Sequence, residues 1–457
     1  MSKKNSTFGS IRALWSTLFG VGMYFTPVAF AKSGILLGCF QLFGVGIFST
    51  LSILFLFLFS LLLIAKIQQE NKKESVPLNT HSINVQEEPE GTELKETNLS
   101  YAELGRTIEK WIGDCIECSI CVSNIFGVLF LQQYVSRVSS SLLPQSLLES
   151  CPFDPYYVFI LIYGTAIWLG GQYRKLQSID WLSMISFGCI LTNCTIVGIM
   201  ACLLGDYRAT HVPNPEKSIS LYAISKFIFS LDCQANVVEV FSEMENKSII
   251  NLAFVAFSAA FGACVFYGAM GITGSLLFGD NMPQQDIIRI FADRESSIIQ
   301  FLLSSNSIFY WVHYIVPCLA IIGIVISSVY QLSAVTRSLY EKKILKKIIN
   351  LDLRQKVVTS AVIMLVSVTN MFQVDLDLVF DFISYFMSNF LGYLFPFIFI
   401  AYHYWKKNYY YVVPCVIIGI GSVCFGTYGF VNSVIEYAFS KQIFTQGKKL
   451  QMVFQRN

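Results

Sequence analysis

The stretch from residue 10 to residue 34, SIRALWSTLFGVGMYFTPVAFAKSG, is long and apolar enough to cross a bilayer of roughly 30 Å. Its middle holds Gly20-Val21-Gly22, and Pro27 follows shortly after. Glycine costs about 1 kcal/mol relative to alanine inside a helix, and proline removes a backbone donor. Freed backbone groups at membrane depth are tolerated only beside protein or a cavity. We therefore interpret this stretch as a helix that opens to expose its backbone to a ligand.

The composition places the chain among membrane proteins. Hydrophobic residues make up 54% of it and charged residues only 14%, whereas soluble domains average about 25% charged. A formal net charge of +2 gives no basis for a nucleic-acid partner. HExxH, GxSxG and Cys/His metal spacings are missing from the sequence, so we expect neither an enzyme nor a resident metal or cofactor. The chain is predicted to be an integral, multi-pass membrane protein.

Apolar runs of about 18 residues or more give roughly eleven membrane spans. They lie near residues 11–32, 36–65, 112–135, 155–173, 182–204, 219–241, 249–278, 305–335, 356–373, 378–403 and 409–433. Residues 66–105 are polar, mixed in charge and poor in aromatic residues, which predicts a mobile loop. The predicted organisation is a short N-terminus over 1–10, a transmembrane domain over 11–433 and a C-terminal tail over 434–457.

The distribution of basic residues predicts a cytosolic N-terminus. Lys3, Lys4, Lys72, Lys73 and the cluster from Arg337 to Lys356 all fall on that side. The loop over 66–105 is then cytosolic as well, and the mildly basic C-terminal tail lies on the outer side.

A second interruption lies in the sixth span, 219–241. Its apolar run halts at Asp232-Cys233-Gln234-Ala235-Asn236 and resumes at Val237. A carboxylate near the membrane centre costs at least about 2.5–3.5 kcal/mol, so Asp232 needs a cavity, a partner or a proton. Broken spans at corresponding positions of two halves are typical of transporter sites built from inverted repeats. The alternative is that Asp232 lies in a short loop between two separate helices.

Other polar or small residues give weaker signals. We expect Asp114 and Glu117 to be interfacial and Asp381 to mark the outer surface. The glycines of YGAMGITG, at positions 268, 271 and 274, predict a close contact between helices.

Four short motifs follow one another in an order that resembles the amino acid/auxin permease family of the APC superfamily. They are Gly20-Val21-Gly22 with Pro27, Ala29-Phe30 and Gly34; SYAELG at residues 100–105; Phe229, Cys233-Gln234, Asn236, Val237-Val238 and Glu243-Met244; and Tyr267-Gly268, Gly271, Gly274 and Phe278-Gly279-Asp280 with Asp286-Ile287-Ile288. The resemblance implies an all-α, LeuT-like fold, with two inverted five-helix repeats, broken helices 1 and 6, and an eleventh helix. It also implies transport of amino acids driven by protons or sodium.

Three positions depart from the family's pattern. Gln234 stands where histidine is frequent, and Glu239 stands where proline is common. Ser16 occupies the position where sodium-coupled members tend to carry asparagine. These departures weaken both a proton route through that histidine and a sodium site at the first helix.

The paired breaks predict where a substrate binds. The positive, N-terminal end of the second half-helix near Gly22 and Met23 suits a carboxylate, and the carbonyls of Phe229 to Leu231 suit an ammonium group. Asp232 adds to the ammonium site or carries the coupling proton. The expected substrate-binding residues are Thr17, Gly20, Val21, Gly22, Met23, Phe229, Leu231, Asp232 and Cys233. By analogy with the family, the candidates for a coupling ion are Ser16, Thr17, Asp232, Ser327 and Ser328.

The function predicted from these features is secondary active transport of amino acids by alternating access, by a protein that acts as a monomer in the lipid bilayer. Protons and sodium both fit as the coupling ion, and the vacuolar, lysosomal and plasma membranes all fit as its location. The alternative is an amino-acid sensor that signals through its cytosolic segments, chiefly residues 66–105.

Overall fold

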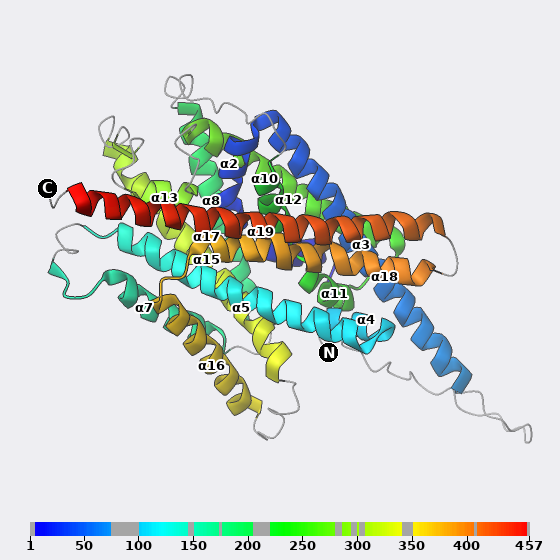
Figure 1. Ribbon diagram of the computed structural model, residues 1–457. Coiled ribbons are helices and arrows are strands. Elements are labelled where there is room, and N and C mark those ends of the chain that lie inside the picture. Colours follow the sequence, from blue (N-terminus) through cyan, green and yellow to red (C-terminus); the bar gives the residue numbers. More distant parts are fainter. Residues whose placement is uncertain are drawn as a thin grey trace, which may run out of the picture.

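The computed structural model describes residues 5–74, 100–144, 150–172, 176–203, 220–278, 286–293, 299–300, 307–340, 351–405 and 409–454. Helices account for nearly all of this part of the chain (Figure 1). Seven of its helices are each long and apolar enough to cross a membrane, and one bent pair adds an eighth span. The predicted multi-pass, all-α character is confirmed.

The first half of the chain contains a broken span followed by four further spans. Its helices are α1 (Thr7–Leu18), α2 (Gly22–Ser33), α3 (Ile35–Glu74), the short α4 (Tyr101–Ile108), α5 (Lys110–Ser141), α7 (Pro155–Gly170) and α8 (Leu176–Leu203).

The second half also begins with a broken span. Its helices are α10 (Leu221–Ser230), α11 (Gln234–Glu243), α12 (Ile249–Phe278), the short α13 (Ile287–Ala292), α15 (Ser307–Tyr340) and α16 (Leu351–Met371). One further span combines α17 (Leu376–Asp381), the π-helical turns η3 (Phe382–Met387) and η4 (Phe390–Leu394), and α18 (Phe395–Tyr404). Helix α19 (Tyr409–Phe454) follows, so every predicted span corresponds to one helix or to a run of consecutive helices.

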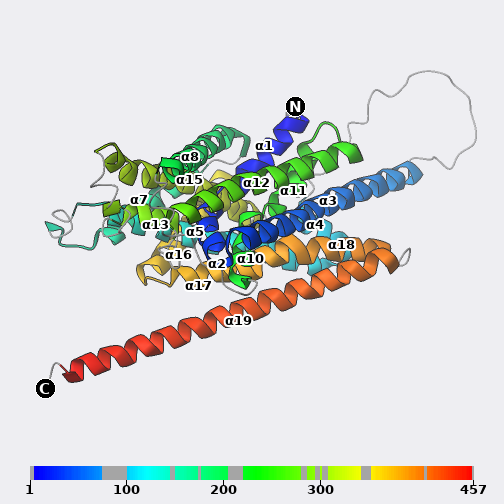
Figure 2. The same cartoon turned by 90° about the horizontal axis from the view of Figure 1, so that it is seen from above.

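Helix α19 lies along the outside of the bundle, where it contacts α18 and the two π-helical turns (Figure 2). Its face away from them is covered with exposed apolar side chains, among them Ile417, Ile420, Tyr428 and Val431. Such a face suits contact with lipid, since every backbone group of a helix is already hydrogen-bonded within the segment.

Two helices extend beyond the predicted boundaries of their spans. Helix α3 continues to Glu74, so the first part of the interval 66–105 is helical; α4 occupies its end, and residues 75–99 lie outside the described residues. Helix α19 continues to Phe454, through most of the predicted C-terminal tail. Polar residues such as Gln68, Glu70 and Lys72 are good helix formers, and loss of hydropathy marks the end of a span but not of a helix.

Packing of α12 against α2 fixes the first broken span in place. A Cβ atom on Gly271 would lie 2.3 Å from the Phe30 ring, and one on Gly274 would lie 2.6 Å from Pro27. Only glycine allows this approach, which confirms the close helix contact predicted for YGAMGITG.

The N-terminal end of α1 is tied to the C-terminal end of α11. The Asn5 N–H donates to the Glu243 carbonyl at 2.7 Å, and the Glu245 N–H donates to the Asn5 carbonyl at 3.0 Å. The Asn5 amide also donates to the Glu243 carboxylate at 3.0 Å. The outer ends of the two broken spans therefore meet at one end of the molecule, which we call the N-terminal end.

Candidate functional site

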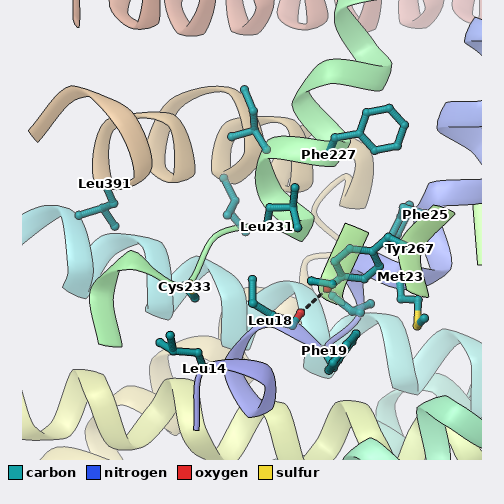
Figure 3. Packing of buried hydrophobic residues seen from close by; sticks show 14 of the residues in the cluster. Leu14, Leu18, Phe19, Met23, Phe25, Phe227, Leu231, Cys233, Tyr267 and Leu391 are labelled. Atoms are coloured by element: carbon teal, nitrogen blue, oxygen red, sulfur yellow. Dashed lines mark hydrogen bonds between the residues drawn. The ribbon is translucent and has the colours of Figure 1, made fainter. Parts of the chain in front are cut away.

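The first break separates α1 from α2, whose axes differ in direction by 66°. Phe19 leaves the helix with an extended backbone, and α2 starts again at Gly22. The Leu18 carbonyl at this break accepts a hydrogen bond from the Tyr267 hydroxyl on α12 (Figure 3). A neighbouring helix thus satisfies a backbone group that the break releases, as membrane depth requires.

The second break separates α10 from α11 over residues 231–233. The Ser49 hydroxyl on α3 donates to the Leu231 carbonyl at 3.0 Å, and the Gln234 amide donates to that hydroxyl at 3.3 Å. The Gln234 side-chain oxygen accepts from the Cys233 N–H at 2.9 Å. Because Gln234 satisfies this N–H, α11 starts at Gln234. The interruption is therefore shorter than the predicted one, which extended to residue 236. Three residues separate α10 from α11, and Asp232 lies in this short connection.

The two breaks lie against each other at the centre of the molecule. A Cβ atom built on Gly22 would lie 2.8 Å from the Ser230 hydroxyl oxygen and 3.0 Å from the Ser230 Cα. The start of α2 therefore approaches the end of α10 at backbone distance. Leu18 and Phe19 of the first break belong to the same buried hydrophobic cluster as Leu231 and Cys233 of the second (Figure 3).

A cavity of about 590 Å³ adjoins both breaks. Nine of the predicted site residues line it: Ser16, Thr17, Gly20, Val21, Gly22, Phe229, Asp232, Cys233 and Ser327. The other three, Met23, Leu231 and Ser328, are almost fully buried and lie outside the lining. Met23 instead contacts Cys194 on α8, with 3.5 Å between the sulfur atoms.

The hydroxyl groups expected at an ion site are all hydrogen-bonded within their own helices. Ser16 and Thr17 donate to the carbonyls of Ala13 and Leu14 at 2.7 and 2.8 Å. Ser327 and Ser328 donate to the carbonyls of α15 one turn earlier, at 3.0 and 2.9 Å. Their lone pairs remain acceptors, and Ser327 lies 3.9 Å from the Cβ position of Gly20. In the described part of the chain, no group of three or more His, Cys, Asp or Glu residues is arranged to hold a metal.

The cavity extends from the breaks toward the N-terminal end of the molecule. There its lining includes Arg106 of α4, Glu117 of α5, Glu239 and Glu243 of α11, and Ser338 of α15. Arg106 forms an ion pair with Glu117, and its side chain is 38% exposed at the rim of the cavity.

Polar groups join three helices at this rim. Arg106 also reaches Asp114 at 3.3 Å, and Ser338 donates to the Glu117 carboxylate at 3.1 Å. The Asp114 side chain is largely exposed, whereas the Glu117 side chain is only 14% exposed.

The opposite end of the cavity is closed by an aromatic cluster around Phe380 on α17. Its ring centroid lies 4.4 Å from that of Phe25, 4.6 Å from that of Phe229 and 5.0 Å from that of Phe130. These side chains come from α2, α10 and α5, so four helices meet at this point. Of the four rings, only Phe229 lines the cavity.

A buried ion pair adjoins the aromatic cluster. The Lys226 ammonium lies 2.7 Å from the Asp381 carboxylate and 3.8 Å from the centre of the Phe380 ring. The expectation that Asp381 marks the outer surface is therefore wrong, because its side chain is buried against α10. Lys226 was not among the predicted site residues. Its presence within the apolar run of the sixth span is the signal that identifies it, since a charge there requires a partner.

A second polar cluster holds α13 on the closed end. The Tyr134 hydroxyl donates to Asp286, which also caps α13 and lies 3.1 Å from the Arg289 guanidinium. His313 of α15 is hydrogen-bonded to the Phe291 carbonyl in α13. The Asp286-Ile287-Ile288 motif thus anchors a short helix over the closed end, while Gly279 and Asp280 lie outside the described residues.

The sequence comparisons agree with this architecture. The family model described as "Transmembrane amino acid transporter protein" matches residues 81–432. The chain is 25% identical over 308 residues to "Vacuolar amino acid transporter 5" of Schizosaccharomyces pombe, a match that covers 65% of this chain and 63% of that protein. It is 27% identical over 117 residues to "Sodium-coupled neutral amino acid transporter 7" of Xenopus laevis, covering 24% of this chain and 25% of that one.

A solved structure shares the fold. The crystal structure of MhsT in complex with L-phenylalanine aligns with a TM-score of 0.57 and 11% identity, over 94% of this chain and 99% of that one. The LeuT-like fold expected from the resemblance is confirmed by this likeness and by the two breaks five spans apart.

Proposed function

Because the chain belongs to the transmembrane amino acid transporter family, we propose that it moves amino acids across a membrane by secondary active transport with alternating access. The relatives carry the names of transporters, in agreement with the expectation that this chain is not an enzyme. Both matches span less than two thirds of the relative's length, so the activity of the whole protein is part of this proposal.

The observation that carries the proposal is the contact between the two breaks at Gly22 and Ser230. At the start of α2 the N–H groups of Met23 and Tyr24 donate to the carbonyls of Gly20 and Val21 at 3.3 and 3.0 Å, and the helix dipole adds roughly half a positive charge at this end. The last carbonyls of α10 provide the complementary negative end. An amino acid in the cavity beside these two helix ends would direct its carboxylate to Gly22 and its ammonium group to Phe229 and Ser230.

The shape of the cavity supports alternating access. The lining continues from the breaks to the N-terminal end, whereas the Phe380 cluster and the Lys226–Asp381 pair close the other end. This arrangement corresponds to one of two states in which a central site faces opposite sides in turn. With the N-terminus in the cytosol, as the basic residues predict, the cavity faces the cytosol.

The coupling ion and the membrane are further parts of the proposal. Proximity of Ser327 to Gly20 supports an ion near the first break, with Ser16 and Thr17 as neighbouring oxygen donors. The name of the Schizosaccharomyces pombe relative favours a vacuolar or lysosomal membrane. The alternative of an amino-acid sensor relies on the interval 66–105, most of which lies outside the described residues, so no contact supports it.

Reconstitution tests the proposed function. Purified protein in proteoliposomes should accumulate labelled amino acids when either a pH gradient or a sodium gradient is imposed. Protein-free liposomes and dissipated gradients serve as controls. No accumulation of any proteinogenic amino acid under either gradient would contradict the proposal.

A further inference from the structure

The cavity is lined mainly by acidic charges. Among the described residues of its lining are five carboxylates, from Glu103, Glu117, Asp232, Glu239 and Glu243, and one cationic group, that of Arg106. Arg106 is already paired with Glu117 and lies 3.3 Å from Asp114. A cavity lined by one sign of charge within low-dielectric walls concentrates ligands of the opposite sign.

The acidic groups continue from the rim to the centre of the molecule. Helix α11 places Glu243 and Glu239 one turn apart on the wall of the cavity. Asp232 lies in the break itself, two residues before the start of α11. Glu117 lines the cavity from α5. A cationic ligand that enters from the rim would meet a carboxylate at each stage of its path to the breaks.

Asp232 is the innermost of these carboxylates. The Ser388 hydroxyl and the Gln234 backbone N–H lie beside it, and none of the ion pairs between described residues includes it. A carboxylate at membrane depth is costly unless a cavity, a partner or a proton stabilises it, and a cationic ligand in this cavity would provide the partner.

We propose that the cavity selects amino acids with a cationic side chain, such as lysine and arginine, and that Asp232 pairs with that side chain. This inference rests on the proposed function, in which the two helix ends already satisfy the carboxylate and ammonium groups that all amino acids share. Asp232 is then available for a charge that only cationic amino acids carry. An anionic side chain would be repelled by Asp232 and Glu239.

Arginine and citrulline provide the test, because they have nearly the same shape and differ in side-chain charge. Their uptake into proteoliposomes is compared with the membrane potential held at zero by potassium and valinomycin, so that voltage does not favour the cation. We expect arginine uptake to exceed citrulline uptake by about tenfold or more, which corresponds to about 1.4 kcal/mol. Lysine against norleucine repeats the comparison with a second pair.

Variants locate the source of the preference. Asp232→Asn should reduce the ratio of arginine to citrulline uptake, and Glu239→Gln should reduce it less. Glu109→Gln is the matched control, because Glu109 is exposed near the same end of the molecule but does not line the cavity. Its ratio should equal that of the wild type.

Several outcomes would overturn the inference. Citrulline uptake equal to that of arginine in the wild type would remove the charge preference, whether or not Asp232→Asn folds. A ratio that survives Asp232→Asn, while the dependence on protons or sodium is lost, would assign Asp232 to the coupling ion instead. Uptake of leucine or glutamine without arginine or lysine would refute the inference and leave the proposed function intact, whereas no uptake at all would refute both.

Discussion

At the scale of single residues, Gly20 and Gly22 stand two positions apart in the same break but have different surroundings. The Cβ position of Gly22 lies 2.8 Å from Ser230, whereas the nearest atom to the Cβ position of Gly20 is the Ser327 oxygen at 3.9 Å. An added methyl group therefore fits at Gly20 and collides at Gly22. Because the collision involves the backbone of α10, it separates the two helix ends that we assign to the substrate.

The glycine pair gives a matched test of this difference. Gly22→Ala should lower amino acid uptake about tenfold or more, because overpacking costs typically 1–3 kcal/mol and each 1.4 kcal/mol is a factor of ten. Gly20→Ala should retain uptake within about twofold. Initial rates in proteoliposomes, normalised to reconstituted protein, measure both. An equal loss of uptake in the two variants would contradict this explanation. It would show that uptake depends on glycine weakening the helix at either position, and not on the close approach of Gly22 to Ser230.

At the scale of elements, side chains from other helices stabilise each break. Tyr267 of α12 donates to the Leu18 carbonyl, and Ser49 of α3 donates to the Leu231 carbonyl. Both donors are fully buried. The breaks are thus fixed features of the bundle, since an unpaired carbonyl at this depth costs more than an ordinary hydrogen bond contributes.

Removal of one donor tests this role. Tyr267→Phe leaves the Leu18 carbonyl without the hydroxyl, and we expect it to reduce stability by about 1–3 kcal/mol. Tyr428→Phe, on the exposed face of α19, is the control and should change stability little. Thermal unfolding followed by tryptophan fluorescence compares the two. An unchanged midpoint for Tyr267→Phe would contradict the account of the first break.

The contact between α12 and α2 gives another prediction. A methyl group on Gly271 would collide with the Phe30 ring at 2.3 Å, whereas nothing lies within 4 Å of the Cβ position of Gly198 on α8. Gly271→Ala should lower the midpoint of thermal unfolding, and Gly198→Ala should leave it unchanged or raise it slightly because alanine favours helix. If both variants behave alike, this contact is not a determinant of the fold.

The sequence predicted the positions of the two breaks, but not their exact bounds or the ion pair beside them. Gly20, Gly22 and Asp232 interrupt apolar runs, so the breaks and the spacing between them were evident without coordinates. The exact bounds of the second break were not, because they depend on a hydrogen bond between Gln234 and Ser49, 185 residues apart. The sequence also did not predict the ion pair between Lys226 and Asp381, because this pair depends on a contact between residues far apart in the chain, on α10 and in the tenth span.

At the scale of the whole molecule, different kinds of contact lie at the two ends of the cavity. The N-terminal end has a partly exposed network around Arg106, in which water competes for the charges of Arg106 and Asp114. The other end has aromatic rings around Phe380 and a buried ion pair. A transporter that alternates between two states must break each set in turn, and the buried set costs more to separate.

The Lys226–Asp381 pair allows this cost to be measured. Lys226→Met or Asp381→Leu alone leaves a buried charge without its partner, and each should reduce stability by about 3–5 kcal/mol. The double variant should recover most of the loss, because apolar side chains can replace a buried pair at little cost. Thermal unfolding of the wild type, both single variants and the double variant completes the cycle. Additive losses would show that the two residues do not act as a pair.

The central claim is that an amino acid binds in the cavity beside the end of α10 and the start of α2. A cryo-electron microscopy map of the protein, held by a rigid antibody fragment and saturated with a transported amino acid, tests it most directly. We predict ligand density in the cavity beside Gly22 and Ser230, with the carboxylate at the start of α2 and the ammonium group at the carbonyls of α10. Density for the same amino acid elsewhere, with the cavity beside the two breaks empty, would contradict the account.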